Sequence, residues 1–422
     1  MKQRPAIQNI AAAIAGNTLE WFDILVYAYF VKAIAANFFP MDNGINSLLL
    51  AYGTFGLSFI ARPLGAIFLG RLADRLGRRT ALVRASALMF LGTLAIAVLP
   101  PYSSIGIVAP VMLLAARLVQ GFSAGGEFGS ATAYLAEQSP HRQAFYSSFQ
   151  FASQGLGMAL AALMGLTLAT WLSPADMMTW GWRVPFLIGA VAGPVAYILR
   201  RNIDETPEYL ATAPHKERAS RHAPVGFIAR CLVGSCAVLA CTVSIYFLVF
   251  IPGFAQTSLH ADPAIAYGGA LVSGITLLGG TPLAGLLADR FGPLRIGALA
   301  AVLIVLTSYP VFSVVVAAVD ERSILLGLFV HAIVTALYLG ALPAILANLF
   351  NTHTRSLGLA ISYNLAVMIA GGFAQMIFVL LIEWTGTRAA PSFYVTFAGA
   401  ASLFAVLACR RMTLVDPNGT AR

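Results

Sequence analysis

The stretch that decides the fold is GRLADRLGRR at residues 70–79, a run of charged residues and glycines between two long apolar segments. A second copy, GLLADRFG, occupies residues 285–292 and begins 215 residues after the first (285 against 70) in a chain of 422 residues. Because glycine lets the backbone turn sharply, each copy predicts a tight, highly charged turn between two helices. Since the copies lie half a chain apart, the sequence predicts two parallel repeats, each a set of apolar helices.

The composition is that of a protein embedded in a membrane. Hydrophobic residues make up 59% of the chain and charged residues only 10%, whereas soluble domains carry roughly 25% charged residues. At about 20 apolar residues per span, the chain has room for about twelve helices. We therefore predict an all-α polytopic membrane protein with two six-helix halves, residues 1–199 and 225–422, joined by a polar cytoplasmic linker at residues 200–224.

The net charge of +9 does not indicate a nucleic-acid-binding protein, because the basic residues fall in short turns between apolar runs rather than on one soluble face. Twenty of the 26 Lys and Arg residues lie on the side of these turns and the termini. Three lie on the opposite side, Arg183, Arg322 and Arg388, and three lie inside predicted spans, Lys32, Arg62 and Arg117. Cytoplasmic loops carry the excess of Lys and Arg in membrane proteins. We therefore expect the repeated turns and both termini to face the cytoplasm.

The first predicted span, at about residues 16–38, contains two acidic side chains, Glu20 and Asp23. An ionisable side chain at the centre of a membrane helix costs about 2.5–3.5 kcal/mol, so its presence indicates a function. Glu20, Asp23 and Tyr27 are spaced by three and four residues and can share one helix face. Asp23 or Glu20 is thus a candidate proton carrier. The alternative for Glu20 is a solvated or structural group near the cytoplasmic end.

The fourth predicted span carries Arg117 about ten residues inside its outer end, which is roughly 15 Å deep at 1.5 Å per residue. A permanently charged guanidinium near the middle of the bilayer needs an anion. That anion could be Asp23, Glu20 or the carboxylate of a substrate, and alternation between such partners would couple proton and substrate. Glu127, in the same span, is either a second proton site or a structural partner of the neighbouring turn.

Small and polar residues complete the candidate interior. Gly121, Gly125 and Gly129 are four residues apart and predict close approach of another helix. Neutral side chains that can line a polar cavity and contact substrate are Tyr27, Gln120, Gln150, Gln154, Tyr246, Tyr338 and Asn364. Hydrogen bonding between helices is the alternative for the glutamines. The third span, at about residues 80–99, is expected to be plain apolar packing, and residues 252–253 are expected to break the seventh span.

The repeated turns are candidate gates. Their proposed gating residues are Gly70, Asp74, Arg75, Gly77, Arg78, Asp289 and Arg290. An aspartate near a helix end can accept hydrogen bonds from free backbone N–H groups or pair with an arginine. The alternative is that the arginines merely hold the turns in the cytoplasm.

These turns resemble the signature loops of the major facilitator superfamily. Five further stretches resemble one of its subgroups, the metabolite:H+ symporter family: GNTLEWFD (residues 16–23), ARPLG (61–65), RLVQGFSAGGEFG (117–129), GWRVPF (181–186) and DETPEY (204–209). The resemblance implies a proton-driven carrier of small polar metabolites in a bacterial inner membrane. Its implied substrates include citrate and other tricarboxylates, dicarboxylates, and zwitterions such as proline and betaine.

Within that range the sequence favours import of a carboxylate together with protons. Protonation of one acid would leave the first half with excess positive charge from Arg117, Arg62 and Lys32. The alternatives are a proline- or betaine-type symporter and, further away, a drug:H+ antiporter, whose cationic substrates Arg117 would repel. Neither an enzyme's nucleophile nor a metal cluster is visible in the spans, so we expect no catalysis and no cofactor. The expected partners are a small organic acid, protons and the bilayer, and the expected state is a monomer.

Overall fold

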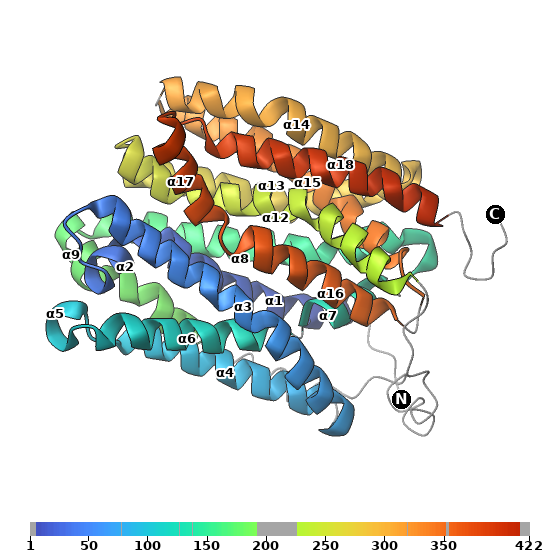
Figure 1. The fold of residues 1–422 in the computed structure, drawn as a ribbon, viewed down its shortest axis with the longest axis horizontal. Coiled ribbons are helices and arrows are strands. Elements are labelled where there is room, and N and C mark those ends of the chain that lie inside the picture. The colour runs from blue at the N-terminus through green and yellow to red at the C-terminus, as the bar shows by residue number, and fades with distance from the viewer. Residues whose placement is uncertain are drawn as a thin grey trace.

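A computed structural model describes residues 6–76, 78–125, 127–136, 138–191, 226–318, 320–351 and 354–413. Long helices run side by side along one axis and are joined by short connections, which confirms the all-α membrane fold predicted from the sequence (Figure 1). The proposed linker at residues 200–224 lies outside the described residues, so the division into halves stays a prediction.

The described part of the first half provides five passes through the bundle and the start of a sixth. Its long helices are α1 (Ala6–Tyr29) with α2 (Val31–Phe38), α3 (Gly44–Leu76), α4 (Arg78–Val98), α6 (Val108–Ala124) with α7 (Glu127–Ala136), α8 (Gln143–Trp171) and a helix over Gly181–Val191. The short elements are α5 (Tyr102–Ile105), η1 (Pro140–Arg142), α9 (Pro174–Thr179) and η2 (Gly181–Arg183).

The second half provides six more. They are α12 (Phe227–Ser258), α13 (Pro263–Phe291), α14 (Pro293–Ala318), α15 (Glu321–Ala347), α18 (Pro391–Thr413), and one pass built from α16 (Arg355–Ala366), the π-helix η4 (Val367–Gly371) and α17 (Ala374–Thr385). Among the described residues, eight helices are long and apolar enough to cross a membrane, and three shorter apolar helices accompany them.

The charged repeats are more helical than the sequence led us to expect. Helix α3 continues to Leu76 and α4 begins at Arg78, so most of the first predicted turn is helix. In the second copy α13 continues to Phe291, and the chain reverses at Gly292, whose φ of +98° is one that a side chain disfavours. The expected break at residues 252–253 is also wrong, because α12 runs through Pro252 to Ser258. Neighbouring helices can satisfy the backbone groups that a proline frees in such a helix.

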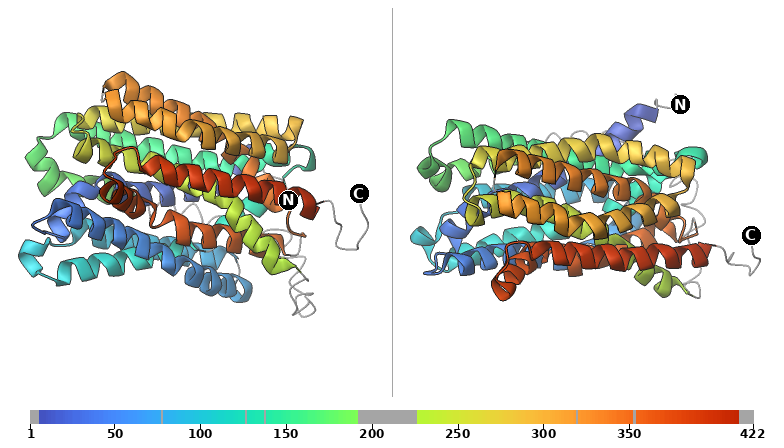
Figure 2. Two further views of the ribbon diagram at one scale, coloured as in Figure 1. Left: turned by 45° about the horizontal axis from the view of Figure 1, so that its top comes forward. Right: turned by 90° about the horizontal axis from the view of Figure 1, so that it is seen from above.

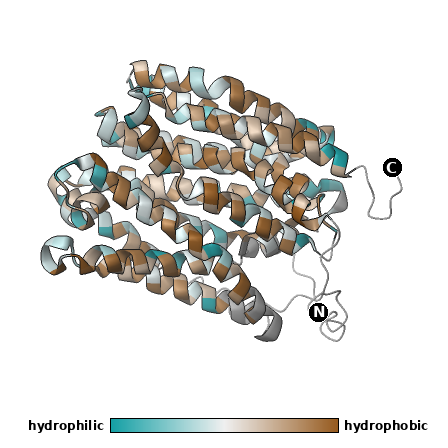
Figure 3. Cartoon of the chain, in the orientation of Figure 1, coloured by the Kyte–Doolittle hydropathy of each residue, from teal (hydrophilic) through white to brown (hydrophobic). Residues whose placement is uncertain are grey.

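The bundle has a turn end and a far end. The turn end carries the junctions of α3 with α4 and of α13 with α14, and the far end carries α5 and α9 (Figures 1 and 2). Apolar residues cover the length of the helices, and polar residues gather toward the helix ends (Figure 3). Trp171 and Trp180 flank α9, Trp384 lies in the last turn of α17, and all three are exposed, as expected of side chains anchored at a membrane interface.

Glycines bring several helix backbones into direct contact. A Cβ at Gly121 or Gly125 would collide with the carbonyl oxygens of Ser58 or Arg62 on α3, and one at Gly65 would collide with the carbonyl of Phe122 on α6. Gly129, the third of the predicted stripe, instead meets Ser356 on α16 of the second half. This confirms the predicted packing role of the stripe.

Candidate functional site

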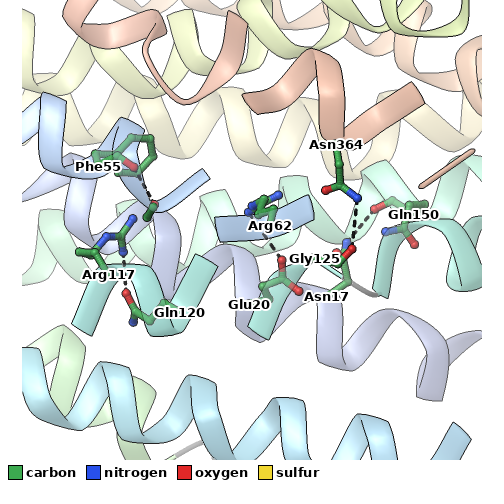
Figure 4. A network of polar contacts seen from close by, with 10 residues as sticks. Asn17, Glu20, Phe55, Arg62, Arg117, Gln120, Gly125, Gln150 and Asn364 are labelled. Carbon is green, nitrogen blue, oxygen red and sulfur yellow. Dashed lines mark hydrogen bonds and ion pairs between the residues drawn. The ribbon is translucent and has the colours of Figure 1, made fainter. Parts of the chain in front are cut away.

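Arg117 occupies the interior of the first half. It lies on α6, its side chain is 1% exposed, and its Nη1 donates to Gln120 Oε1 at 2.8 Å (Figure 4). Its Cζ lies 4.4 Å from the ring centroid of Tyr27 and 5.1 Å from that of Phe55. The negative faces of aromatic rings attract a cation. Two rings and an amide therefore hold this charge in place of water.

Asp23 is the buried acid that faces this arginine network. Its Oδ2 accepts a hydrogen bond from Thr93 Oγ1 at 2.8 Å, and the backbone at Gly189 packs against the carboxylate. Gln120 Nε2 donates to Thr93 Oγ1, also at 2.8 Å. Within the described residues, Asp23 and Arg117 are thus joined through two neutral side chains and not by a direct ion pair.

The second acid, Glu20, pairs with a different arginine. Its Oε1 lies 3.7 Å from Nη2 of Arg62 on α3 (Figure 4). Arg62 is 3% exposed, and its Cζ lies 4.3 Å from the ring centroid of Phe59. Of the two acids that were alternatives for Arg117, the structure places Glu20 on Arg62. The site therefore contains two arginines and two carboxylates, each arginine stacked on a ring of α3. Lys32, by contrast, is exposed on α2.

An aromatic wall connects these groups to the second half. Tyr246 of α12 lies 5.9 Å from Phe55, 5.7 Å from Phe59 and 6.1 Å from Trp21 between ring centroids. The π-helix η4 closes on the same wall, because a Cβ at Gly371 would collide with Thr242 and Tyr246. Irregular π segments in helices are frequent at functional sites. Residues of both halves thus meet beside the two arginines.

Several buried polar atoms in the interior have no hydrogen-bond partner within the described part of the chain. They are the side-chain nitrogen and oxygen of Gln150 and Gln375, the hydroxyl of Tyr246, and Nε of Arg62 and Arg117. The Gln154 amide faces the hydroxyl of Tyr363. Leaving a buried polar group unsatisfied costs about 1–3 kcal/mol. Groups of this kind are ready to bind the polar atoms of a ligand.

Two other candidates donate their hydroxyls to carbonyl groups inside the protein. Tyr27 Oη donates to the carbonyl of Ala51 at 3.0 Å, and its ring carries Arg117. Tyr338 Oη donates to the carbonyl of Ala237 at 2.6 Å, within the second half. His331 lines a separate small cavity with Phe247, Ser308 and Phe312.

Asn364 ties the two halves together. Its Nδ2 donates to the carbonyl of Gly125 at 3.1 Å, at the point where α6 ends (Figure 4). Nearby, the rings of Phe128 and Tyr363 stack with centroids 3.5 Å apart. These contacts close the space between α7 and α16 on the turn-end side of the site.

The far end is closed as well. Tyr267 Oη donates to the carbonyl of Tyr29 at 3.2 Å, and its ring stacks on Phe30 at 5.9 Å. Both residues of the first half lie at the junction of α1 and α2. The two halves are therefore in contact through Tyr29 and Tyr267 as well as through Gly125 and Asn364.

At the turn end, Asp289 accepts hydrogen bonds from the first backbone N–H groups of α8. Its two carboxylate oxygens lie 2.8 Å from Ala144 N and 3.0 Å from Phe145 N. Of the two partners considered for this aspartate, the structure shows free N–H groups at a helix start, and Arg290 lies over the ring of Phe291. The remaining gate and proton candidates, Gly70, Asp74, Arg75, Gly77, Arg78 and Glu127, lie outside the residues whose side chains are described.

Thr93 is the functional candidate that sequence reasoning missed. The third span was expected to be plain packing, but this threonine binds both Asp23 and Gln120. The available signal was the single hydroxyl residue in the apolar stretch at residues 87–98 of α4. Its partners are remote in sequence, and only the fold brings them together.

The geometry can be set beside known proteins. Residues 8–224 match the family model described as sugar (and other) transporter. A citrate-proton symporter of Klebsiella pneumoniae is 33% identical over 412 residues, covering 97% of this chain and 93% of the relative. A putative proline/betaine transporter of Staphylococcus haemolyticus is 32% identical over 408 residues, covering 93% and 85%.

Solved structures support the fold. The proton:xylose symporter XylE bound to 6-bromo-6-deoxy-D-glucose superposes with a TM-score of 0.78 at 17% sequence identity, covering 96% of this chain and 95% of that one. A D-xylose-proton symporter superposes with a TM-score of 0.77 at 19% identity, covering 99% of both chains. The chain therefore belongs to the major facilitator superfamily and, within it, to the metabolite:proton symporters.

Proposed function

We propose that this chain is a proton-coupled symporter that imports a small carboxylate metabolite, such as citrate or a dicarboxylate, by alternating access. The observation that carries the proposal is the fully buried guanidinium of Arg117, linked to the buried carboxylate of Asp23 and placed beside the contact of the two halves. Groups of this kind inside a membrane mark substrate and proton pathways.

The charges of the site favour an anionic substrate. Arg62 and Arg117 are balanced by Glu20 and Asp23, and proton uptake by one acid leaves one unit of positive charge in a buried space. An unpaired buried charge is costly, and a carboxylate of the substrate removes that cost. The unpartnered amide of Gln150 can then bind hydroxyl or further carboxylate oxygens.

The proposed cycle follows from this balance. In the outward-facing state, Asp23 or Glu20 takes up a proton and no longer attracts the arginines. Arg117 then binds a substrate carboxylate. The halves then rock about the central site. Facing inward, the proton leaves, the acid attracts the arginine network again, and the substrate is expelled. Each ligand shifts the equilibrium only through its different affinity for the two states.

A zwitterion such as proline or betaine is the second candidate substrate. It is favoured by the proline/betaine transporters among the relatives and by the aromatic wall. The faces of Trp21 and Tyr246 offer cation–π contacts for an ammonium group, while Arg117 would bind its single carboxylate.

We further propose that the protein is a monomer in a bacterial cytoplasmic membrane with both termini in the cytoplasm. The bacterial origin of the relatives supports the location. The distribution of Lys and Arg supports the orientation. The turn end of the bundle would then face the cytoplasm.

Transport by proteoliposomes tests the proposal. Uptake of labelled citrate, 2-oxoglutarate and proline is measured with and without an inward proton gradient. Gradient-dependent accumulation of a carboxylate that excess proline does not inhibit is the expected result. Accumulation of proline or betaine alone would assign the zwitterion function, and gradient-independent equilibration of every substrate would contradict symport.

A further inference from the structure

We propose that Thr93 and Gln120 are positioning residues that transmit the protonation of Asp23 to Arg117. The inference rests on the proposed proton-coupled function, and it assigns the coupling to two neutral side chains in place of a direct ion pair. It is carried by three consecutive hydrogen bonds of 2.8 Å that link Arg117, Gln120, Thr93 and Asp23.

The direction of every hydrogen bond in this relay is determined by its chemistry. A guanidinium only donates hydrogen bonds, so the atom of Gln120 that faces Arg117 is the oxygen. The nitrogen of Gln120 then faces Thr93 and must donate to its hydroxyl oxygen. The single hydroxyl proton of Thr93 is left to point at Asp23 Oδ2. All donors therefore point from the arginine toward the carboxylate.

Such a relay is complete only when Asp23 Oδ2 accepts, which is its role in the ionised carboxylate. The aligned bonds polarise one another and tie the guanidinium to a remote negative charge. When Asp23 takes up a proton, the negative charge at the end of the relay is lost. If that proton lies on Oδ2 and points at Thr93, the Thr93 hydroxyl donates instead to a carbonyl of its own helix. Gln120 then holds Arg117 without support from a charge, and the guanidinium is available to a substrate carboxylate.

The surroundings of Asp23 leave this relay as its main polar connection. Helix α4 presents the neutral Thr93, and the helix over Gly181–Val191 presents the backbone at Gly189. Arg117 on α6 is the charged group that acts on Asp23 from a neighbouring helix. On its own helix the nearest acid is Glu20, which is paired with Arg62 of α3.

The same two helices also contain a matched control outside the relay. Ser123 Oγ on α6 donates to the carbonyl of Ala85 on α4 at 2.6 Å, and this serine is buried. Ser123→Ala removes one buried hydroxyl from the contact between α4 and α6, as Thr93→Val does, but leaves all three relay bonds in place. A general weakening of this helix contact would affect both variants alike.

The test measures how many protons are taken up for each citrate bound. Purified protein in detergent is titrated with citrate by calorimetry at pH 6.5, in buffers of different ionisation enthalpy. Proline replaces citrate as the probe if wild-type protein binds proline alone. Titration of the free ligand contributes equally to every variant, so differences between variants report the protein.

The expected result is proton uptake by wild-type protein, Thr93→Ser and Ser123→Ala, with uptake at least twofold lower in Thr93→Val. Gln120→Met, which breaks the relay at its other member, is expected to match Thr93→Val and serves if that variant does not fold. Wild-type proton uptake in Thr93→Val or Gln120→Met would overturn the relay. Absence of binding of both citrate and proline to wild-type protein would instead overturn the proposed function, and the relay with it.

Discussion

The burial of Arg117 makes it the most sensitive single residue of the site. We expect Arg117→Ala to lower citrate uptake by at least about 30-fold, because losing a buried charged partner costs about 2–5 kcal/mol. Uptake by proteoliposomes, normalised to inserted protein, is the measurement. Lys32→Ala is the matched control, since it removes an exposed cation of the same half. Accumulation of substrate by a properly inserted Arg117→Ala protein would refute the proposed binding role.

Asp23 gives a prediction that separates binding from coupling. Asp23→Asn keeps the size of the side chain and an acceptor oxygen for Thr93, but it cannot take up a proton in the physiological range. We therefore expect exchange of labelled for unlabelled citrate to continue, while accumulation driven by a proton gradient is lost. Full gradient-driven accumulation by this variant would exclude Asp23 as the proton carrier and leave Glu20, paired with Arg62, as the next candidate.

At the scale of the elements, the contact of Asn364 with Gly125 predicts how the turn end opens. Asn364→Ala removes a hydrogen bond between the halves worth about 1 kcal/mol, which corresponds to about a fivefold shift toward states open at this end. Spin labels at Tyr134 on α7 and Leu357 on α16 would report longer distances in the variant. Asn37→Ala, which removes an amide bonded to Met178 within the first half, should leave the distances unchanged. Equal distance distributions in all three proteins would show that the Asn364 hydrogen bond does not hold the turn end closed.

The contact of α3 with α6 predicts the outcome of two glycine substitutions. Gly121→Ala forces a methyl group against the carbonyl of Ser58, and overpacking of this kind costs about 1–3 kcal/mol. Gly279→Ala, in α13, meets nothing within 4 Å and gains up to about 1 kcal/mol of helix propensity. The thermal unfolding temperature in detergent should fall for the first variant and hold or rise for the second. The reverse order would show that the helices separate readily at Gly121.

For the whole molecule, the sequence was sufficient for the fold and for the charged part of the site. Hydropathy and the repeat determine the membrane helices because each apolar span must bury its own backbone. The cost of intramembrane charge likewise pointed to Asp23 and Arg117. Pairings could not be predicted in the same way: Glu20 binds Arg62 because of how α1 and α3 pack. The roles of Thr93 and Asn364 likewise depend on hydrogen-bond partners that lie on other helices.

Because the backbones of α3 and α6 touch at Gly65, Gly121 and Gly125, Arg62 and Arg117 stand on one rigid piece of the protein. The distance between these two arginines then stays constant during transport. A substrate therefore meets the same distance between the two arginines when the site faces outward and when it faces inward. Discrimination by size between acidic groups would be equal on both sides of the membrane, and only the protonation of the acids would distinguish loading from release.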